Sequence, residues 1–354
     1  MNRRTFLQRS ALGAAAFSVP AWPMAGFANE VPMGVVVHSY GFRWNSRVSS
    51  RNYPGFTNAI DLLEHCHDIG AGGIQVVVKD WSTDFASKVR DRREKLGMYL
   101  EGSIGMPKKA EDVPAFEQDV QRAREAGVQV LRTVSLGGRR YETFKTLGEF
   151  RQFQQAGLAA LQLAEPVLRK HKVKLAVENH KDWRAPELVA VLKQVSSEYI
   201  GTTIDFGNSI ALLEDPMEVL QALAPYVMST HIKDMAVEEY TDGFLLSEVP
   251  LGTGILDLPK MVAICKQHNP SVTFNLEMIT RDPLEIPCLK EGYWATFADV
   301  PATELARTLH MVRTHKPKQA LPRTTPLSPE TRLATEEENI ISCLTYSKNK
   351  LAMR

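Results

Sequence analysis

The chain has few cysteines and almost no excess of charge. Its 354 residues include four cysteines, and 42 basic residues are balanced by 41 acidic ones. Without a Cys-x-x-Cys pair or dense spacing, the cysteines provide no disulfide framework. We expect mostly buried thiols, and a Cys265–Cys288 bridge is the one pairing left open. A net charge of +1 supplies no global basic field, so we expect no nucleic-acid partner.

Long apolar runs are also lacking. The first 28 residues contain Arg3 and Arg4 followed by Thr-Phe-Leu, then an interrupted Ala-rich stretch, then small residues up to Ala28. This order is typical of a twin-arginine export signal, and the alternative is an N-terminal membrane anchor. We expect residues 1–28 to be cleaved and the protein to be periplasmic or otherwise exported. No later segment is apolar enough to span a bilayer, so no membrane span is expected in the mature chain.

Eight short, nearly continuous apolar runs follow the signal. Such runs are typical of parallel strands that are covered on both faces. The runs are Met33–His38, Gly73–Val78, Gly97–Glu101, Gln129–Val134, Val173–Glu178, Ile200–Asp205, Val227–His231 and Val272–Glu277. Helical patterns separate most of them, over Phe56–Ile69, Asp112–Ala126, Leu147–Lys170, Pro186–Val195, Asp215–Leu223, Leu258–Gln267 and Thr303–His315.

This alternation predicts an α/β fold, a (β/α)8 TIM barrel over residues 29–316. A doubly wound open sheet normally carries a Gly-rich phosphate loop after its first strand. Here that position reads HSYGFRWNSR, which argues against the open sheet. Residues 317–354 begin rich in Pro, Thr and charge and are expected to form an extended surface tail. A terminal helix over Leu333–Leu351 would either cap the barrel or reach a partner subunit, and a homo-oligomer stays open.

Four of the strand-like runs end in groups that bind metals: Glu178, Asp205, His231 and Glu277. Alone, each is more typical of a helix cap or a salt bridge. At the carboxyl ends of the last four barrel strands, however, they converge on one face. Buried together they would repel one another unless a cation neutralised them. Three carboxylates and one imidazole suit a hard divalent ion, so we predict one metal site here.

Together with two further motifs, these ligands resemble the xylose isomerase-like (sugar phosphate isomerase/epimerase) TIM barrels over residues 33–315. The motifs are the His-x-Lys-Asp stretch His231–Asp234 and the Gly-x-Gly-x-Leu-Asp-like loop Gly252–Asp257. The resemblance implies one divalent metal, Mn, Mg or Co, that holds two oxygens of a carbohydrate substrate. It also implies that Glu178 and Glu277 act both as ligands and as proton-transfer groups.

The candidate substrate-binding residues are His38, His180, Asn208, Lys233 and Arg281. Epimerases of the family often have a His three residues after the strand-six Asp, where this chain has Asn208. His180, two residues after Glu178, is expected to bind a hydroxyl or act as an acid, unless it is a structural surface residue. Lys233 is the best candidate to stabilise an enolate, whereas Arg281 could instead hold a loop through Asp282.

Two reactions fit these residues. The first is metal-dependent isomerisation or epimerisation of a sugar, by proton abstraction next to a carbonyl and stabilisation of an enediolate. The second is a lyase or hydrolase reaction on a 3-keto sugar or glycoside. An endonuclease-IV-like phosphodiesterase needs more histidines than lie near the site, and a non-catalytic sugar-binding barrel is the remaining alternative.

Overall fold

The computed structural model describes residues 32–44, 46, 48–317 and 319–353. The predicted export signal lies outside these residues and stays a prediction. Among the helices of the described residues, none has the length and apolarity needed to cross a membrane. All four cysteines are buried and free, so the bridge left open between Cys265 and Cys288 is absent from the structure.

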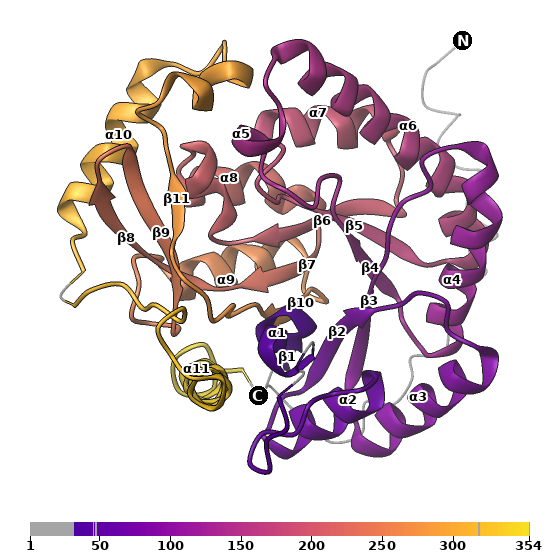
Figure 1. Cartoon of the computed structure of the whole chain (residues 1–354). Helices are drawn as coiled ribbons and strands as arrows, with labels where there is room; N and C mark the ends of the chain where they lie inside the picture. The colour runs from indigo at the N-terminus through magenta and orange to yellow at the C-terminus, as the bar shows by residue number, and fades with distance from the viewer. Residues whose placement is uncertain (1–31, 45, 47, 318, 354) are drawn as a thin grey trace, which may run out of the picture. The chain divides into compact units, whose positions relative to one another are not determined.

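Eight parallel strands form a closed barrel, so the predicted (β/α)8 fold is confirmed (Figure 1). The strand order around the barrel is β1-β10-β7-β6-β5-β4-β3-β2. All eight predicted runs contribute a strand. The strands are β1 (Met33–Val36), β2 (Gly73–Val77), β3 (Tyr99–Ser103), β4 (Val130–Thr133), β5 (Lys174–Glu178), β6 (Ile200–Asp205), β7 (Val227–Ile232) and β10 (Thr273–Leu276).

Helices surround the barrel and cover its strands (Figure 1). The α-helices are α1 (Gly41–Trp44), α2 (Ala59–Asp68), α3 (Thr83–Leu96), α4 (Val113–Glu125), α5 (Arg140–Thr143), α6 (Leu147–His171), α7 (Ala185–Val195), α8 (Pro216–Leu223), α9 (Leu258–His268), α10 (Ala302–Thr314) and α11 (Pro329–Lys350). Short 3-10 helices are η1 (Val37–Tyr40), η2 (Ala110–Asp112), η3 (Asn208–Leu212), η4 (Ala224–Tyr226) and η5 (Glu291–Thr296).

Local sequence explains where helix α8 starts. Asp215 caps α8 by accepting hydrogen bonds from the backbone N–H groups of Met217 and Glu218, which is the N-cap role that its position predicts.

Helix α3 was not predicted from the sequence pattern. Only two of its side chains, Ala86 and Val89, are buried, so its apolar stripe is too narrow to stand out from the charged residues around it.

A second, antiparallel sheet was not predicted. It consists of β8 (Asp234–Tyr240), β9 (Gly243–Val249) and β11 (Leu284–Ile286), in the order β11-β9-β8. Strands β8 and β9 form a hairpin directly after barrel strand β7. The sheet matters for the site because it carries Glu248 and lies at the carboxyl end of β7, the end that bears His231.

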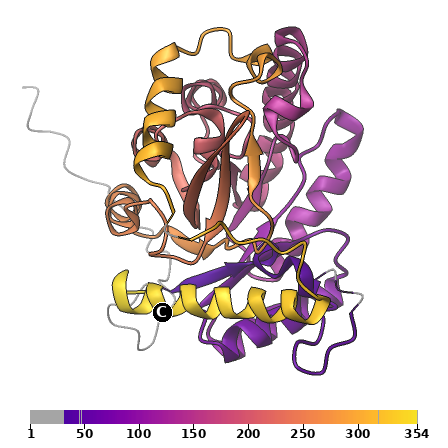
Figure 2. The ribbon, with the colours of Figure 1, turned by 60° about the vertical axis from the view of Figure 1, so that its left-hand side comes forward.

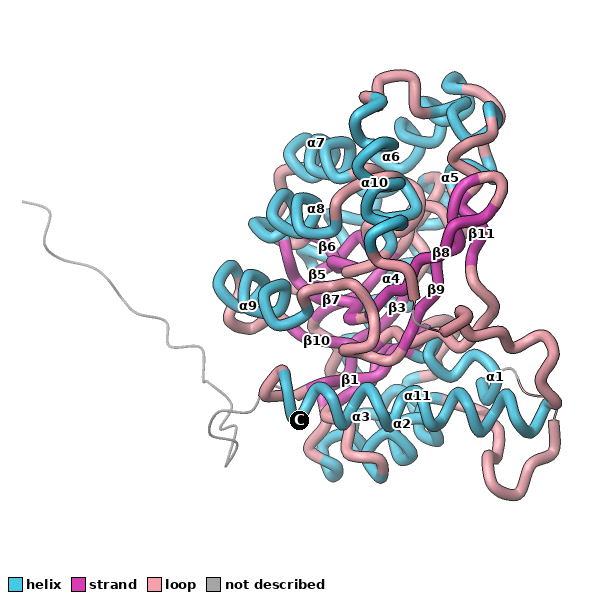
Figure 3. The backbone as a smooth tube through the Cα atoms, turned by 90° about the vertical axis from the view of Figure 1, so that its left-hand side faces the viewer, coloured by secondary structure: helices cyan, strands magenta, loops and turns pink. Residues whose placement is uncertain are grey.

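The C-terminal segment divides into an irregular part and a long helix. Residues 319–328 contain no helix or strand, as expected for an extended tail. Helix α11 then lies beside α1 and η1, which directly follow β1 (Figures 2 and 3). It buries Ile340 and Cys343 in the main hydrophobic core, and Leu333 of the same helix is buried as well. Of the two roles left open for a terminal helix, packing on the barrel is the one observed in the described residues.

Candidate metal centre and substrate cavity

The four predicted ligands come together at the carboxyl ends of their strands. Glu178, Asp205, His231 and Glu277 each offer one ligand atom, and these atoms all lie within 4.8 Å of one another. All four residues are buried. The strands place them there because β5, β6, β7 and β10 are neighbours in the barrel, and Asp205 and His231 are partners in the ladder.

Two atoms of this cluster lack a hydrogen-bond partner among the described residues. They are His231 Nδ1 and Asp205 Oδ2, and both are buried. His231 Nδ1 lies 3.4 Å from Glu178 Oε2, 3.4 Å from Glu277 Oε1 and 3.9 Å from Asp205 Oδ2. Because buried polar atoms are rarely left unpaired, atoms that face one another in this way fit a cation-binding site. The cluster can therefore bind a metal.

Neighbouring groups orient these two atoms. His231 Nε2 lies 2.8 Å from Gln75 Oε1. Gln75 uses its amide to donate to Glu101 Oε2 at 2.8 Å, so its oxygen is left to accept from Nε2–H. That hydrogen bond fixes the tautomer in which Nδ1 carries a lone pair. Asp205 Oδ1 accepts from the backbone N–H groups of Gly207 and Asn208, which leaves Oδ2 for the cluster.

Replacing Gln75 with leucine is expected to weaken metal binding. The substitution removes the acceptor that orients His231, and loss of such an outer partner typically lowers metal affinity by about 10–100-fold. Titration of the metal-free protein with Mn²⁺, by calorimetry, measures this directly. An exposed glutamine on α4, Gln121, provides the control Gln121→Leu. Equal affinities for Gln75→Leu and the wild type would contradict the orienting role.

Cationic side chains also contact the cluster. Arg132 Nε donates to Glu178 Oε2 at 2.6 Å. Lys233 Nζ donates to Glu277 Oε2 at 2.6 Å and forms an ion pair with Asp205 Oδ2 at 2.8 Å, although not in hydrogen-bond geometry. Burial raises the pKa of Glu178, but Arg132 and His231 outweigh it and hold the pKa below its usual range. For Glu277, Lys233 and His231 likewise outweigh burial and hold its pKa well below that range.

A cavity of about 280 Å³ opens above these residues. It is lined by His38, Arg132, Val134, Gly137, His180, Lys181, Lys233, Glu277, Ile279 and Arg281. Four of the five predicted substrate-binding residues are therefore on its wall. His38 is the most open of them: its side chain is 43% exposed, and its Nδ1 lies 3.4 Å from Glu277 Oε1.

Asn208, the fifth predicted residue, is not among the residues that line the cavity. Its side chain lies behind Glu178 and donates to Glu178 Oε1 at 3.0 Å. Its other side-chain atom, Oδ1, accepts a hydrogen bond from Lys181 Nζ. Asn208 thus holds a candidate ligand in place, while direct contact with a substrate stays a prediction without support from this geometry.

Arg281 is held by Glu248 rather than by its neighbour in sequence. Its Nε donates to Glu248 Oε2 at 3.0 Å. Asp282, the partner that the sequence suggests, instead accepts hydrogen bonds from Thr324 and Thr325 of the C-terminal segment. Asp282 therefore secures the tail, and Arg281 points to the cavity.

Three residues of the site were missed at the sequence level as members of it: Gln75, Lys181 and Glu248. Gln75 and Glu248 lie inside strands, where a polar residue gives no signal of the face it occupies. Lys181 follows His180 directly, and the same turn after β5 brings both to the cavity wall. The only available signal was its place beside a predicted substrate-binding residue.

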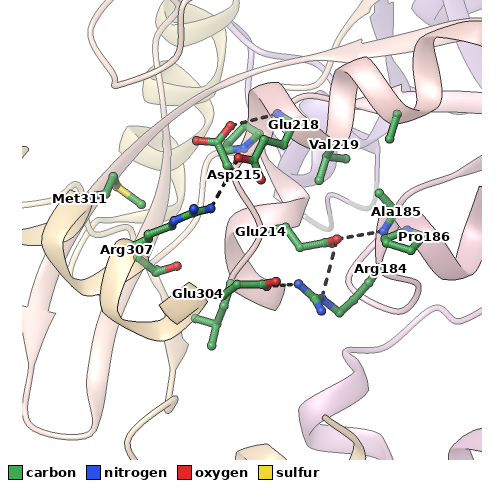
Figure 4. A pocket seen from close by; sticks show the side chains of 14 residues that line it. Arg184, Ala185, Pro186, Glu214, Asp215, Glu218, Val219, Glu304, Arg307 and Met311 are labelled. Atoms are coloured by element: carbon green, nitrogen blue, oxygen red, sulfur yellow. Dashed lines mark hydrogen bonds and ion pairs between the residues drawn. The ribbon is translucent and has the colours of Figure 1, made fainter. Parts of the chain in front are cut away.

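A second and larger cavity, about 480 Å³, lies between α7, α8 and α10 (Figure 4). It contains none of the four metal-ligand candidates. Arg184 points to Glu304 and Glu214 across it, and Arg307 pairs with Glu218 at 3.6 Å. Its charged groups hold the surrounding helices together. The smaller cavity above the ligand cluster is therefore the candidate active site.

Known proteins resemble this chain over most of the barrel. The family model described as xylose isomerase-like TIM barrel matches residues 63–298. The 3-oxo-isoapionate decarboxylase of Pectobacterium atrosepticum is 30% identical over 232 residues, which cover 64% of this chain and 78% of that protein.

Solved structures share the fold at lower identity. A D-psicose 3-epimerase determined in the presence of D-fructose is 12% identical, with a TM-score of 0.55 over 80% of this chain and 97% of that one. A xylose isomerase-like TIM barrel protein from Mycobacterium smegmatis, determined in complex with magnesium, is 16% identical, with a TM-score of 0.52 over 79% and 98% of the two chains. At these identities the likeness concerns the fold alone.

Proposed function

Because this chain belongs to the xylose isomerase-like TIM barrel family, we propose that it is a divalent-metal-dependent sugar isomerase or epimerase. The observation that carries the proposal is the ligand cluster itself. Glu178 and Glu277 are two carboxylates in one cluster with His231 Nδ1 and Asp205 Oδ2, which have no hydrogen-bond partner among the described residues. Such an arrangement can hold a cation and move a proton at the same place.

The reaction we propose begins with removal of a proton from the carbon next to a substrate carbonyl. Glu178, Asp205, His231 and Glu277 would hold the ion, and a bound divalent ion supplies polarisation of the carbonyl and stabilisation of the developing negative charge. Glu277 lines the cavity and is the candidate base. Glu178 is the candidate for returning a proton from the other side. Lys233, at 2.6 Å from Glu277, keeps that carboxylate in place.

Hydrogen exchange with solvent tests this proposal. We expect the protein, stripped of metal by a chelator and then given Mn²⁺, Mg²⁺ or Co²⁺, to introduce deuterium from D₂O next to the carbonyl of its ketose substrate. The same protein without metal should not do so, and mass spectrometry of a panel of free ketoses and 3-keto-glycosides measures the difference. Turnover that is equally fast after chelation, with metal analysis confirming its removal, would refute the metal dependence.

A second candidate, a lyase, is favoured by the 30% identical decarboxylase. In decarboxylation of a 3-oxo acid the bond between the carboxyl carbon and its neighbour breaks and carbon dioxide leaves. The electron pair stays on the neighbouring carbon, is delocalised onto the carbonyl oxygen as an enolate, and is later protonated. This route needs no base for its first step. Release of carbon dioxide or another fragment would distinguish it from isomerisation.

A further inference from the structure

Lys181 is a buried cation of the cavity wall that has no acidic partner among the described residues. The residue is 4% exposed, and its Nζ donates to the uncharged amide oxygen of Asn208. The other cations of the wall differ in this respect. Arg132 pairs with Glu178, Lys233 with Asp205 and Glu277, and Arg281 with Glu248. Among the described residues no carboxylate lies within ion-pair distance of Lys181, so its charge is balanced less directly than the charges of the other three cations.

The cations of the cavity wall can also be counted against the carboxylates that pair with them or belong to the ligand cluster. The cations Arg132, Lys181, Lys233 and Arg281 face the carboxylates Glu178, Asp205, Glu248 and Glu277. Four positive and four negative groups cancel, so a divalent cation in the cluster leaves two positive charges when the histidines are neutral. Uncompensated charge in a buried site is costly. A neutral sugar would not reduce that cost, whereas an anionic substrate would.

The form of the anion follows from the donors that are still available. Arg132 and Arg281 already use their guanidinium groups on Glu178 and Glu248, so no free arginine fork remains for a phosphate. What remains is one ammonium and the buried His180 Nδ1, which has no partner among the residues described. One ammonium matches one carboxylate. A cavity of about 280 Å³ lies at the small end of ligand sites and suits a single sugar unit.

We infer that the substrate is a keto-sugar acid and that Lys181 is the specificity-determining residue that binds its carboxylate. The inference rests on the proposed function of the site and adds the chemical class of the substrate. It applies to an isomerase, an epimerase or a lyase alike, since each would act on a carbonyl elsewhere in the same molecule.

Matched pairs of ligands test this inference by binding rather than by turnover. Each pair, such as D-fructuronate with D-fructose and D-tagaturonate with D-tagatose, differs by a carboxylate in place of a hydroxymethyl group. Calorimetry on the Mn²⁺-loaded protein measures dissociation constants for the wild type, Lys181→Met and Lys181→Arg. The exposed lysine on α7, Lys193, supplies the control Lys193→Met, and thermal melting with metal analysis shows that each variant is folded and loaded.

We expect the wild type to bind at least one acid about tenfold or more tightly than its neutral partner, the scale of one charge-assisted hydrogen bond. Lys181→Met should bring the ratio of the two affinities to about one, and Lys181→Arg should restore part of the preference for the acid. If no acid binds more tightly than its neutral partner, or if Lys181→Met weakens both equally, the inference is wrong. A preference for acids without any metal-dependent turnover would instead refute the proposed function and leave this inference standing.

Discussion

Replacing Glu277 with glutamine should lower metal-dependent turnover by roughly 10²–10⁴-fold, the range over which a positioned acid or base accelerates a reaction. Glu277 is the one ligand candidate that also lines the cavity. Its carboxylate lies 3.4 Å from His231 Nδ1 and 2.6 Å from Lys233 Nζ. A neutral amide of the same size keeps the packing but can neither accept the substrate proton nor balance Lys233.

Loss of the base must be separated from loss of the metal. For this purpose the Mn²⁺ dissociation constant of Glu277→Gln is measured beside its turnover, and turnover is compared at saturating Mn²⁺. A rate defect that persists at saturation indicates proton transfer, and one that disappears indicates a ligand role alone. Glu285 on β11 is exposed, so Glu285→Gln is a matched control with wild-type behaviour. If a variant with both Glu178 and Glu277 replaced still turned over normally, the catalytic proposal would be refuted.

The barrel could be predicted because its signal is repeated. Each barrel strand is a short, nearly continuous apolar run, and eight of them in order leave few alternative folds. The β8–β9 hairpin could not be recognised in the same way. It follows β7 without a separating helix, and a prediction based on alternating strands and helices therefore does not include it. Helix α3 was missed for a different reason. It buries only Ala86 and Val89, so its sequence is dominated by charged residues and shows no clear apolar stripe.

The same contrast holds within the site. Glu178, Asp205, His231 and Glu277 could be found because each closes a strand, and strand ends have a known direction in a barrel. The contacts of Lys181 and Glu248 depend on how loops and the second sheet fold over that end. Lys181, in the loop after β5, reaches Asn208 in the next strand–loop unit, and Glu248 reaches Arg281 from a different sheet. Side-chain pairs across such distances follow from packing and not from local pattern.

The second large effect expected concerns the C-terminal helix: Glu337→Ala should destabilise the fold by roughly 3–5 kcal/mol, the usual result of removing one partner of a buried ion pair. Glu337 Oε2 accepts a hydrogen bond from Arg43 at 2.7 Å, and its Oε1 lies 3.0 Å from His65 Nε2. The Arg43 side chain is only 3% exposed. Without Glu337 the guanidinium keeps its burial but loses its countercharge.

Urea unfolding of the full chain measures this loss, and an adjacent residue supplies the control. Glu338 is exposed on the same helix, so Glu338→Ala should change the free energy of unfolding by no more than about 0.5 kcal/mol. A difference below about 1 kcal/mol between the two variants would show that α11 does not depend on this pair. Because Arg43 lies in α1, close after His38, we also expect Glu337→Ala to weaken substrate binding.

The dependence of this stabilisation on pH distinguishes the ion pair from simple packing. Burial raises the pKa of Glu337, but His65 and Arg43 outweigh it, so the pKa lies below its usual value in the folded protein. A carboxylate with a lowered folded pKa stabilises the fold at pH values above its unfolded pKa of about 4.3, and this contribution is lost as the pH falls through the folded pKa. The wild type should therefore lose its advantage over Glu337→Ala below about pH 4. If the two unfolding curves instead stayed a constant distance apart from pH 7 to pH 3, the helix would be held by its apolar contacts and not by this charge.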